Sequence, residues 1–161
     1  MNFRPNLSKD KPKTEGKSGQ YEPVSNYMAT DLVTFHLDQD IEEAIDTMIE
    51  QEISGAPVLN DDGELAGVIT EQDCLRLLID VAYHNQMLSK SKVRDYMTEN
   101  PVTVSIDQDV LDVANLFLKT NFRRFPVVDQ GKLAGQVSRR DILRAAKNIE
   151  SATWRQSEKS F

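Results

Sequence analysis

The chain has 161 residues, of which 39% are hydrophobic and 28% charged, a composition typical of a folded protein with one or two modest cores. No apolar run approaches the roughly 20 residues needed to cross a bilayer, and the first residues lack the apolar stretch of a secretory signal. We therefore expect a cytoplasmic location and no membrane partner. The formal net charge of -7 would repel a nucleic-acid backbone, so we also expect no nucleic-acid partner.

The chain offers little for metal binding or catalysis. One cysteine, Cys74, and two histidines, His36 and His84, are too few for a Cys/His zinc site, so we expect no structural metal. The sequence has no nucleophile elbow and no phosphate-cradling GxxxxGK(S/T) loop, and no histidine lies near Cys74 in the sequence. We therefore expect no catalytic residues and no enzyme activity.

In chain order, residues 1–22 come first and are expected to form a disordered N-terminal segment, because they are polar and have little to bury. An internal repeat follows. The segment VSNYMATDLVTFHLDQD from Val24 has a counterpart 69 residues later, VRDYMTENPVTVSIDQD from Val93. The match continues at a shift of 68, and it predicts a first repeat with a connecting helix over residues 23–91, a second repeat over 92–150 and a C-terminal tail over 151–161.

Each repeat shows the same order of periodic segments after a short helical turn around Tyr27 or Tyr96. An alternating strand precedes a helix with apolar residues at helical spacing, which begins after Asp40 or Asp109 as N-cap. Two strands joined by a glycine turn and a second helix complete the unit. The ranges are 33–37 and 102–106 for the first strand, 40–51 and 109–120 for the first helix, 56–60, 64–70, 125–129 and 132–138 for the hairpins, and about 71–87 and 139–150 for the second helix.

The fold class is therefore α/β of the α+β type, with two β-α-β-β-α repeats. One repeat covers only one face of its small sheet with helices. We expect the two sheets to pack face to face about a pseudo-twofold axis, which leaves two equivalent clefts between the copies.

The segments V-x-(D/N)-Y-M-T-x-x-P-V-T-V, R-R-F-P-V-V-D and L-A-G-x-(V/I)-(S/T)-x-x-D resemble tandem cystathionine-β-synthase (CBS) domains, over residues 24–149. The resemblance implies a stand-alone regulatory module that binds adenine nucleotides or related adenosyl ligands in the clefts, and it implies disc-like dimers. The first copy is acidic, with two Lys/Arg against fourteen Asp/Glu in residues 23–91, whereas residues 92–161 have twelve against nine. This difference favours an antiparallel homodimer in which the first copy faces the second copy of its partner.

Two short motifs begin the second helices. Thr70 and Asp73, like Ser138 and Asp141, have the spacing of a capping box, which explains them without any ligand. The resemblance additionally implies that Asp73 and Asp141, with their hydroxyl partners, bind the ribose of a nucleotide.

Four arginines distinguish the second copy: Arg123, Arg124, Arg139 and Arg140 replace Ser54, Gly55, Glu71 and Gln72 of the first copy. Arginine forms permanently charged, bidentate contacts with phosphate, so we expect these four to bind the phosphate groups, although each alone is typical of a solvated surface. The residues before the central prolines, Ala56 and Phe125, are expected at the adenine edge, where the resemblance implies contact with the base; Phe125 equally fits a core.

The leading hypothesis is a sensor module whose regulatory ligand is AMP, ADP or ATP, with no obligatory cofactor, and which transmits ligand binding to an unknown regulated protein by conformational change. Two alternatives remain open. The chain could be a constitutive dimerisation or interaction scaffold with non-functional clefts, a hypothesis favoured if the arginines are ion-paired to the acidic copy. The ligand could also be S-adenosylmethionine or another adenosyl compound.

Overall fold

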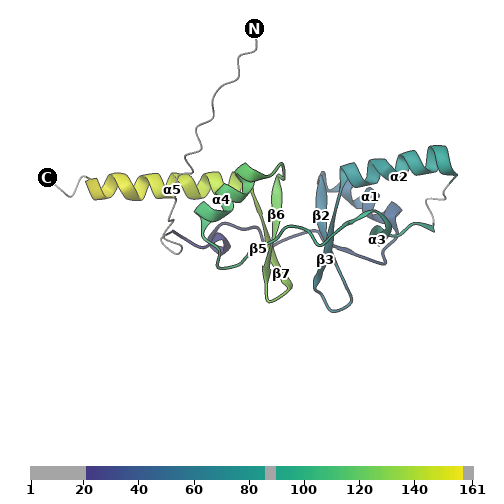
Figure 1. Cartoon of the computed structure of the whole chain (residues 1–161), viewed down its shortest axis with the longest axis horizontal. Helices are drawn as coiled ribbons and strands as arrows, with labels where there is room; N and C mark the ends of the chain where they lie inside the picture. The colour runs from purple at the N-terminus through teal and green to yellow at the C-terminus, as the bar shows by residue number, and fades with distance from the viewer. Residues whose placement is uncertain (1–20, 86–89, 158–161) are drawn as a thin grey trace, which may run out of the picture.

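The computed structural model describes residues 21–85 and 90–157, with side chains up to residue 149. The chain forms two lobes, each a small sheet with helices on its outer side (Figure 1). The first lobe contains β1 (Phe35–His36), α1 (Ile41–Glu50), β2 (Gly55–Leu59), β3 (Leu65–Thr70), α2 (Glu71–His84), α3 (Val93–Tyr96) and β4 (Thr98–Glu99). The second lobe contains the 3-10 turn η1 (Val24–Asn26), β5 (Val104–Ser105), α4 (Val110–Lys119), β6 (Arg124–Asp129), β7 (Lys132–Ser138) and α5 (Arg139–Ser157).

The strand order within each sheet follows from the repeated unit. The first sheet has the order β1-β2-β3-β4 and the second β5-β6-β7. In both sheets the first strand is parallel to the second, because a helix connects them, and the hairpin makes the next pair antiparallel. The predicted α/β class and the two-repeat arrangement are confirmed.

The two sheets face each other in the middle of the molecule, as predicted from their uncovered faces (Figure 1). Along β2, Ala56 and Val58 point into the core of the first lobe, so the intervening Pro57 points to the opposite face, where it is also buried. Pro126 of β6 is buried in the same way between Phe125 and Val127 of the second core. Apolar packing between the sheets therefore supplements the two helix-covered cores.

The segments that lead into the repeats are exchanged between the lobes. Val24 is fully buried in the core of the second lobe, whereas Val93 is fully buried in the core of the first lobe. Further along, Ala29 forms an isolated bridge with Gln136 of β7, and β4 pairs with β3. Residues 24–29 and 93–99 are called the leading segments below; each lies on the lobe formed mainly by the other repeat.

Two glycines permit this close approach. A Cβ atom on Gly67 would lie 2.6 Å from the carbonyl oxygen of Thr98, and one on Gly135 would lie 2.6 Å from that of Ala29. Because Gly67 and Gly135 are equivalent in the repeat, the same lack of a side chain admits a leading segment in each lobe.

Several elements differ in extent from the sequence prediction. α2 ends at His84 and not at about Met87, because Asn85 adopts the left-handed conformation with φ of 52°, a common helix terminator. α5 continues beyond the predicted end at residue 150 to Ser157, so the predicted tail begins as helix. Residues 158–161 lie outside the described residues.

The two predicted N-caps behave differently. The carboxylate of Asp109 accepts a hydrogen bond of 2.7 Å from the backbone N–H of Leu111 and caps α4. Asp40 stands at the N-cap position of α1, but its side chain makes no capping hydrogen bond and pairs with the ammonium group of Lys92. The prediction of a capping side chain at Asp40 is therefore wrong, because a long-range ion pair takes its carboxylate.

Most of the predicted disordered segment, residues 1–20, lies outside the described residues. Tyr21 and Glu22 are attached to the second lobe: the N–H of Tyr21 donates to the carboxylate of Asp109 at 3.0 Å, and the carbonyl of Glu22 accepts from Val110 at 3.1 Å. Within the described part of the chain, no helix has both the length and the apolar character needed to cross a membrane.

Candidate functional site

Two capping boxes occupy equivalent positions in the lobes. At the start of α2, the backbone N–H and the hydroxyl of Thr70 both donate to Oδ2 of Asp73, each at 2.9 Å, and the N–H of Asp73 donates back to the Thr70 hydroxyl at 3.4 Å. At the start of α5, Ser138 and Asp141 form the same three hydrogen bonds, at 2.7, 2.8 and 3.2 Å. The capping role read from the sequence is therefore present in both copies.

The boxes leave one carboxylate oxygen of each aspartate for other contacts. Asp73 and Asp141 are only 5% and 8% exposed, and each uses its Oδ2 in the box. Oδ1 of Asp141 is ion-paired with Arg144, one helical turn later, whereas Oδ1 of Asp73 lies 4.0 Å from the nearest nitrogen of Arg76. Both carboxylates are thus held in fixed orientations, and the second is the more strongly paired.

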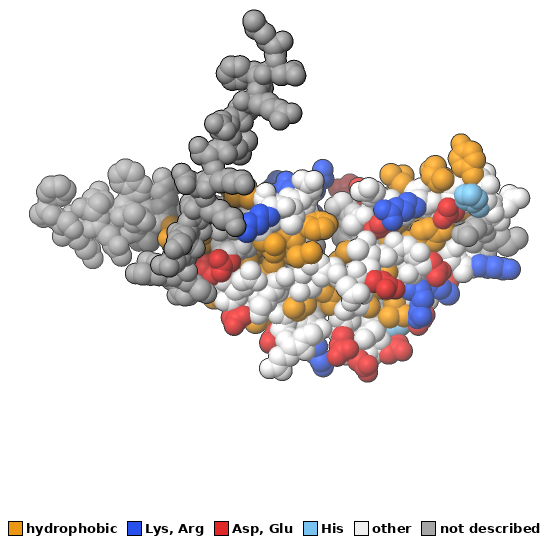
Figure 2. Space-filling model, in the orientation of Figure 1, with side chains coloured by type: hydrophobic (Ala, Val, Ile, Leu, Met, Phe, Trp, Pro, Cys, Tyr) orange, Lys and Arg blue, Asp and Glu red, His pale blue; other side chains and the backbone are white. Residues whose placement is uncertain are grey.

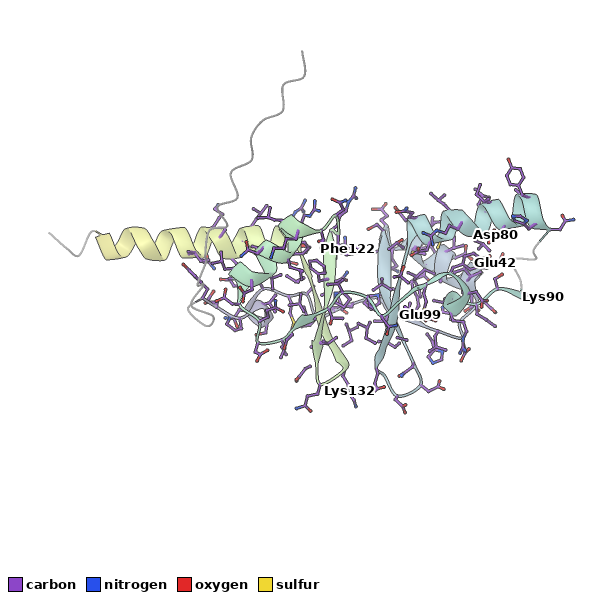
Figure 3. The ribbon with its side chains drawn as sticks, viewed as in Figure 1. Glu42, Asp80, Lys90, Glu99, Phe122 and Lys132 are labelled. Carbon is purple, nitrogen blue, oxygen red and sulfur yellow. The ribbon has the colours of Figure 1, made fainter. Side chains whose placement is uncertain are left out.

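The two helix starts lie close to the middle of the molecule. α2 and α5 begin beside the facing sheets and run outward in opposite directions, as a twofold relation between the lobes requires (Figure 1). The hairpin turns lie at the other end of the sheets, where Glu64 and Lys132 form an isolated bridge, and Figure 3 shows Lys132 there. Each buried carboxylate therefore stands at the positive end of a helix, at the end of the sheets opposite the hairpins.

All four arginines predicted to bind phosphate are exposed and lie on one rim of the second lobe. The backbone N–H of Arg139 donates to the carbonyl of Arg123 at 3.3 Å, which joins the start of α5 to the start of β6. Arg124 pairs with Ser138 in the sheet register, and Arg140 follows Arg139 on α5. We call Arg123, Arg124, Arg139 and Arg140 the arginine rim.

No ion pair between the arginine rim and an acidic group occurs among the described residues. In the first lobe the same backbone contact joins Glu71 to Ser54 at 3.0 Å, so that rim carries no positive charge at the equivalent positions. The structure therefore brings the four predicted arginines together with their charges available to an anion.

The residues predicted at the adenine edge have core side chains. Phe125 is 1% exposed and its ring lies 4.5 Å from that of Phe117, while Ala56 is 4% exposed in the first core. Only backbone groups at these two positions could reach a base, so a role for the Phe125 ring against a ligand is not supported by its position.

Sequence reasoning missed three features near the site. Phe122, just before the arginine rim, is 52% exposed. Arg76 and Arg144 lie beside the buried carboxylates, and their equivalence in the repeat was the available signal. A cavity of about 440 Å³ lies between α2 and α3 and is lined by Arg76, Ile79, Asp80, Asp95, Tyr96 and Met97.

The reactive side chains of the first lobe do not form a catalytic group. Burial raises the pKa of the Cys74 thiol to about 11, and the carboxylates of Asp73 and Glu71 add to the shift, so the thiol is a poor nucleophile. His36 forms an ion-pair contact of 2.9 Å with Asp61, and its Nδ1 accepts from the N–H of Asp38.

His36, Asp38 and Asp61 are also the one set of three potential metal ligands found together in the described residues. The carboxylate of Asp38 is already paired with Arg94, and both aspartates are exposed. Nδ1 of His36 already accepts from the N–H of Asp38, and its Nε2 lies 2.9 Å from Asp61. This chemistry suits an ion-pair cluster better than a metal site.

The comparisons with known proteins agree with this geometry. The family profile described as the CBS domain matches residues 24–80 and 93–148, so the chain belongs to the CBS domain family and contains two copies of the domain. Among curated proteins, the MJ1225 protein of Methanocaldococcus jannaschii is 32% identical over 139 residues. The match covers 86% of this chain and 48% of that protein, so the chain spans about half the length of this relative.

Two solved structures of CBS pairs are similar throughout the paired domains. The structure of CBSX2 in complex with AMP, a protein of Arabidopsis thaliana, has a TM-score of 0.70 and 31% identity over 80% of this chain and 98% of that chain. The CBS pair of protein MJ0100 in complex with 5'-methylthioadenosine and S-adenosyl-L-methionine has a TM-score of 0.64 and 28% identity over 80% of this chain and 98% of that chain. The chain thus shares its two-repeat fold with CBS pairs solved with different adenosyl ligands.

Proposed function

We propose that this chain is a regulatory module that binds an adenine nucleotide of the AMP, ADP or ATP type and transmits the bound state to a partner protein. The observation that carries the proposal is the buried, oriented carboxylate at the start of each of α2 and α5, together with the arginine rim at the start of α5. CBSX2 with AMP and MJ0100 with its adenosyl ligands support the ligand class.

The proposed residue roles follow from the chemistry of each group. Asp73 and Asp141, held by Thr70 and Ser138, accept hydrogen bonds from ribose hydroxyls through Oδ1. The arginine rim binds the phosphate groups. The backbone at Ala56 and Phe125 contacts the edge of the adenine, since their side chains belong to the cores. No step of the proposal requires a cofactor, a metal or a catalytic residue.

Signal transmission requires the ligand to favour one arrangement of the lobes or chains. Apolar side chains on the outer helices support a homodimer as the unit that changes: Ile49, Leu75, Leu78, Ile79 and Tyr83 in the first lobe, and Leu111, Leu118 and Leu143 in the second, are each 46–85% exposed. α1 and α2 carry seven acidic and one basic residue, whereas α4 and the described part of α5 carry two and five. This complementarity favours an antiparallel dimer.

Calorimetry of the purified chain with AMP, ADP, ATP, adenosine, S-adenosylmethionine, NAD and cyclic dinucleotides tests the proposal. We expect adenine nucleotides to bind, and the R123Q/R124Q and R139Q/R140Q variants to lose about 10-fold or more in ATP affinity with little change for adenosine. K119Q/K147Q removes the same charge elsewhere on the second lobe and serves as the control.

The two alternatives predict other outcomes. Binding of none of these compounds would favour the constitutive scaffold. Binding of S-adenosylmethionine alone, with an affinity that does not depend on the arginine rim, would favour an adenosyl sensor. The dimer is tested by sedimentation: L75E and L118E should each give monomers, and salt should weaken the wild-type dimer. The cytoplasmic location and the absence of membrane or nucleic-acid partners stay predictions.

A further inference from the structure

The cavity between α2 and α3 in the first lobe is lined by none of the residues assigned to the nucleotide. Its volume of about 440 Å³ lies within the usual range of small-molecule pockets, about 300–1,000 Å³. Asp80, labelled in Figure 3, lines the cavity from α2, and Asp95, Tyr96 and Met97 line it from α3 and the residue after it. Figure 2 shows apolar, basic and acidic side chains beside one another over α2. The cavity therefore combines apolar surface with charges of both signs.

Two carboxylates in the cavity are oriented by contacts within the lobe. Oδ2 of Asp80 accepts a hydrogen bond of 3.0 Å from the hydroxyl of Tyr96, and Oδ2 of Asp95 accepts one of 2.8 Å from the backbone N–H of Lys92. Among the described residues, Oδ1 of either aspartate takes part in no hydrogen bond. Each carboxylate is thus held in place with one oxygen available to a ligand.

The cations nearest to Asp95 along the chain are paired with other carboxylates. Lys92 forms an ion pair with Asp40, and Arg94 forms one with Asp38. In the part of the chain that the structure describes, no lysine or arginine forms an ion pair with Asp80 or Asp95. Because two like charges line the same cavity, it attracts cationic groups.

Arg76 adds one positive group to the same cavity. Its side chain is 69% exposed, and its nearest nitrogen lies 4.0 Å from the carboxylate of Asp73, which is too far for a hydrogen bond. A guanidinium group has five N–H donors in a planar arrangement that matches a carboxylate, so Arg76 can bind an anionic group. Ile79, which is 53% exposed, and the half-buried Met97 supply the apolar part of the lining.

The second lobe has a different chemistry at the equivalent positions. Asn148 and Asn26 correspond to Asp80 and Asp95, and Lys147 corresponds to Ile79. The attraction for cations at these positions is therefore specific to the first lobe. Since the second repeat folds with amides at both positions, asparagine is a conservative substitution for either aspartate.

We propose that this cavity binds a free amino acid with a cationic side chain, of the lysine, ornithine or arginine type. The lining has two negative groups and one positive group, and such an amino acid has two positive groups and one negative group. Its α-carboxylate binds Arg76, and its two cationic groups bind Asp80 and Asp95. Its methylene chain lies against the apolar side chains of Ile79 and Met97.

This inference goes beyond the proposed function and does not rest on it. The arginine rim and the capping-box aspartates take no part in binding the amino acid, so the two ligands have separate sites. Binding of the amino acid and binding of the nucleotide are therefore tested by separate titrations of the same protein.

Calorimetry of the full chain with L-lysine, L-ornithine and L-arginine tests the inference. We expect all three to bind. L-norleucine lacks the side-chain amine of lysine, and cadaverine lacks its carboxylate. Each should bind at least about 10-fold more weakly than lysine, because each has lost one charged contact.

Substitutions of the lining identify the groups that bind. D80N and D95N should each weaken lysine binding by about 10-fold or more, whereas D46N removes the same charge from the exposed side of α1 and should bind like the wild type. R76Q should weaken the binding of lysine but not that of cadaverine, which has no carboxylate for Arg76. Circular dichroism of each variant verifies that the fold is retained.

Several outcomes would overturn this inference. They are the absence of binding by all three basic amino acids, unchanged lysine affinity in both D80N and D95N, and binding of cadaverine as tight as that of lysine. Competitive displacement of lysine by AMP would place it in the nucleotide site and would also overturn the inference. Equally tight binding of Nα-acetyl-lysine methylamide would indicate a lysine side chain of a partner protein instead. A wild-type protein that binds lysine but no nucleotide would overturn the proposed function alone.

Discussion

The hydroxyl of Tyr96 in the second leading segment donates a hydrogen bond of 3.0 Å to the carboxylate of Asp80 on α2. The equivalent Tyr27 accepts a hydrogen bond of 3.0 Å from Asn148 on α5, the residue that corresponds to Asp80. In both lobes the tyrosine of the repeated Tyr-Met pair thus fastens an exchanged segment to the second helix of the lobe that receives it.

Replacing Tyr96 with Phe tests this attachment. We expect the free energy of unfolding to fall by about 1 kcal/mol or more, because the hydrogen bonding of the phenol to Asp80 and Ser91 is lost while the ring stays. Tyr83→Phe is the control, since Tyr83 lies on α2 like Asp80 but is 78% exposed. Urea denaturation measures both variants, and equal stabilities would show that the Tyr96 contact contributes nothing.

The same contact predicts a pH dependence. Burial raises the pKa of Tyr96 above its ordinary value, and the hydrogen bond to Asp80 adds to the shift. A raised pKa in the folded state means that the neutral phenol is favoured there, so its contribution is complete below about pH 10 and is lost as the pH rises further. Wild-type stability should therefore fall more steeply above pH 10 than that of Tyr96→Phe, as followed by circular dichroism.

Gly135 is expected to be essential for docking the first leading segment. A Cβ atom at this position would lie 2.6 Å from the Ala29 carbonyl oxygen and 2.7 Å from the Met28 sulfur, so Gly135→Ala should cost about 1–3 kcal/mol. Hydrogen exchange should show faster opening of the Ala29 amide, which donates to Gln136 at 2.8 Å.

Gly131→Ala is the matched control for this variant. Gly131 has a φ of 82°, and a Cβ atom there would have no neighbour within 4 Å, so alanine strains the turn without blocking the segment. Preferential opening at Ala29 in the Gly131 variant, or unchanged exchange in the Gly135 variant, would contradict the close-approach explanation.

Asp141→Asn should weaken AMP binding by about 10- to 150-fold if the carboxylate accepts charged hydrogen bonds from the ribose. The side-chain oxygen of asparagine can still accept from the backbone N–H of Ser138 in the capping box, so the fold should persist. Asp109→Asn is a suitable control, because Asp109 is likewise a buried carboxylate at a helix start, 7% exposed, but lies outside the proposed site. An equal loss of affinity in both variants would point to a general structural effect.

Cys74 should react slowly in the folded protein. With its pKa raised to about 11, mainly by burial, only about 0.1% of the thiol is ionised at pH 8. Iodoacetamide should therefore modify it much more slowly than it modifies the unfolded chain, and the rate should increase with pH up to about 11. Because Asp73 adjoins Cys74, nucleotide bound at Asp73 should slow the reaction further. Rapid modification of the folded protein at pH 8 would contradict the assignment.

Local patterns in the sequence predicted much of this structure. Apolar spacing located α1 to within one residue at each end, and the Thr-x-x-Asp and Ser-x-x-Asp spacings predicted both capping boxes. The pairing of Asp40 with Lys92 was not predictable, because the two residues are 52 positions apart and only the fold brings them together. The exposure of Phe122 likewise depends on how α4 turns into β6, whereas an alternating pattern identifies only Phe125 as inward-facing.

The exchange of the leading segments has a consequence for folding during synthesis on the ribosome. The core of the first lobe contains Val93, so it cannot close when residue 85 has emerged and must wait for the start of the second repeat. The core of the second lobe contains Val24, which is synthesised before every other residue of that core. Val24 therefore lacks its full set of packing partners until β7 has been synthesised. The first lobe can therefore close only after the second repeat has begun, and the second lobe closes last. A gene cut between the repeats would encode two halves that each lack a piece of their own interior.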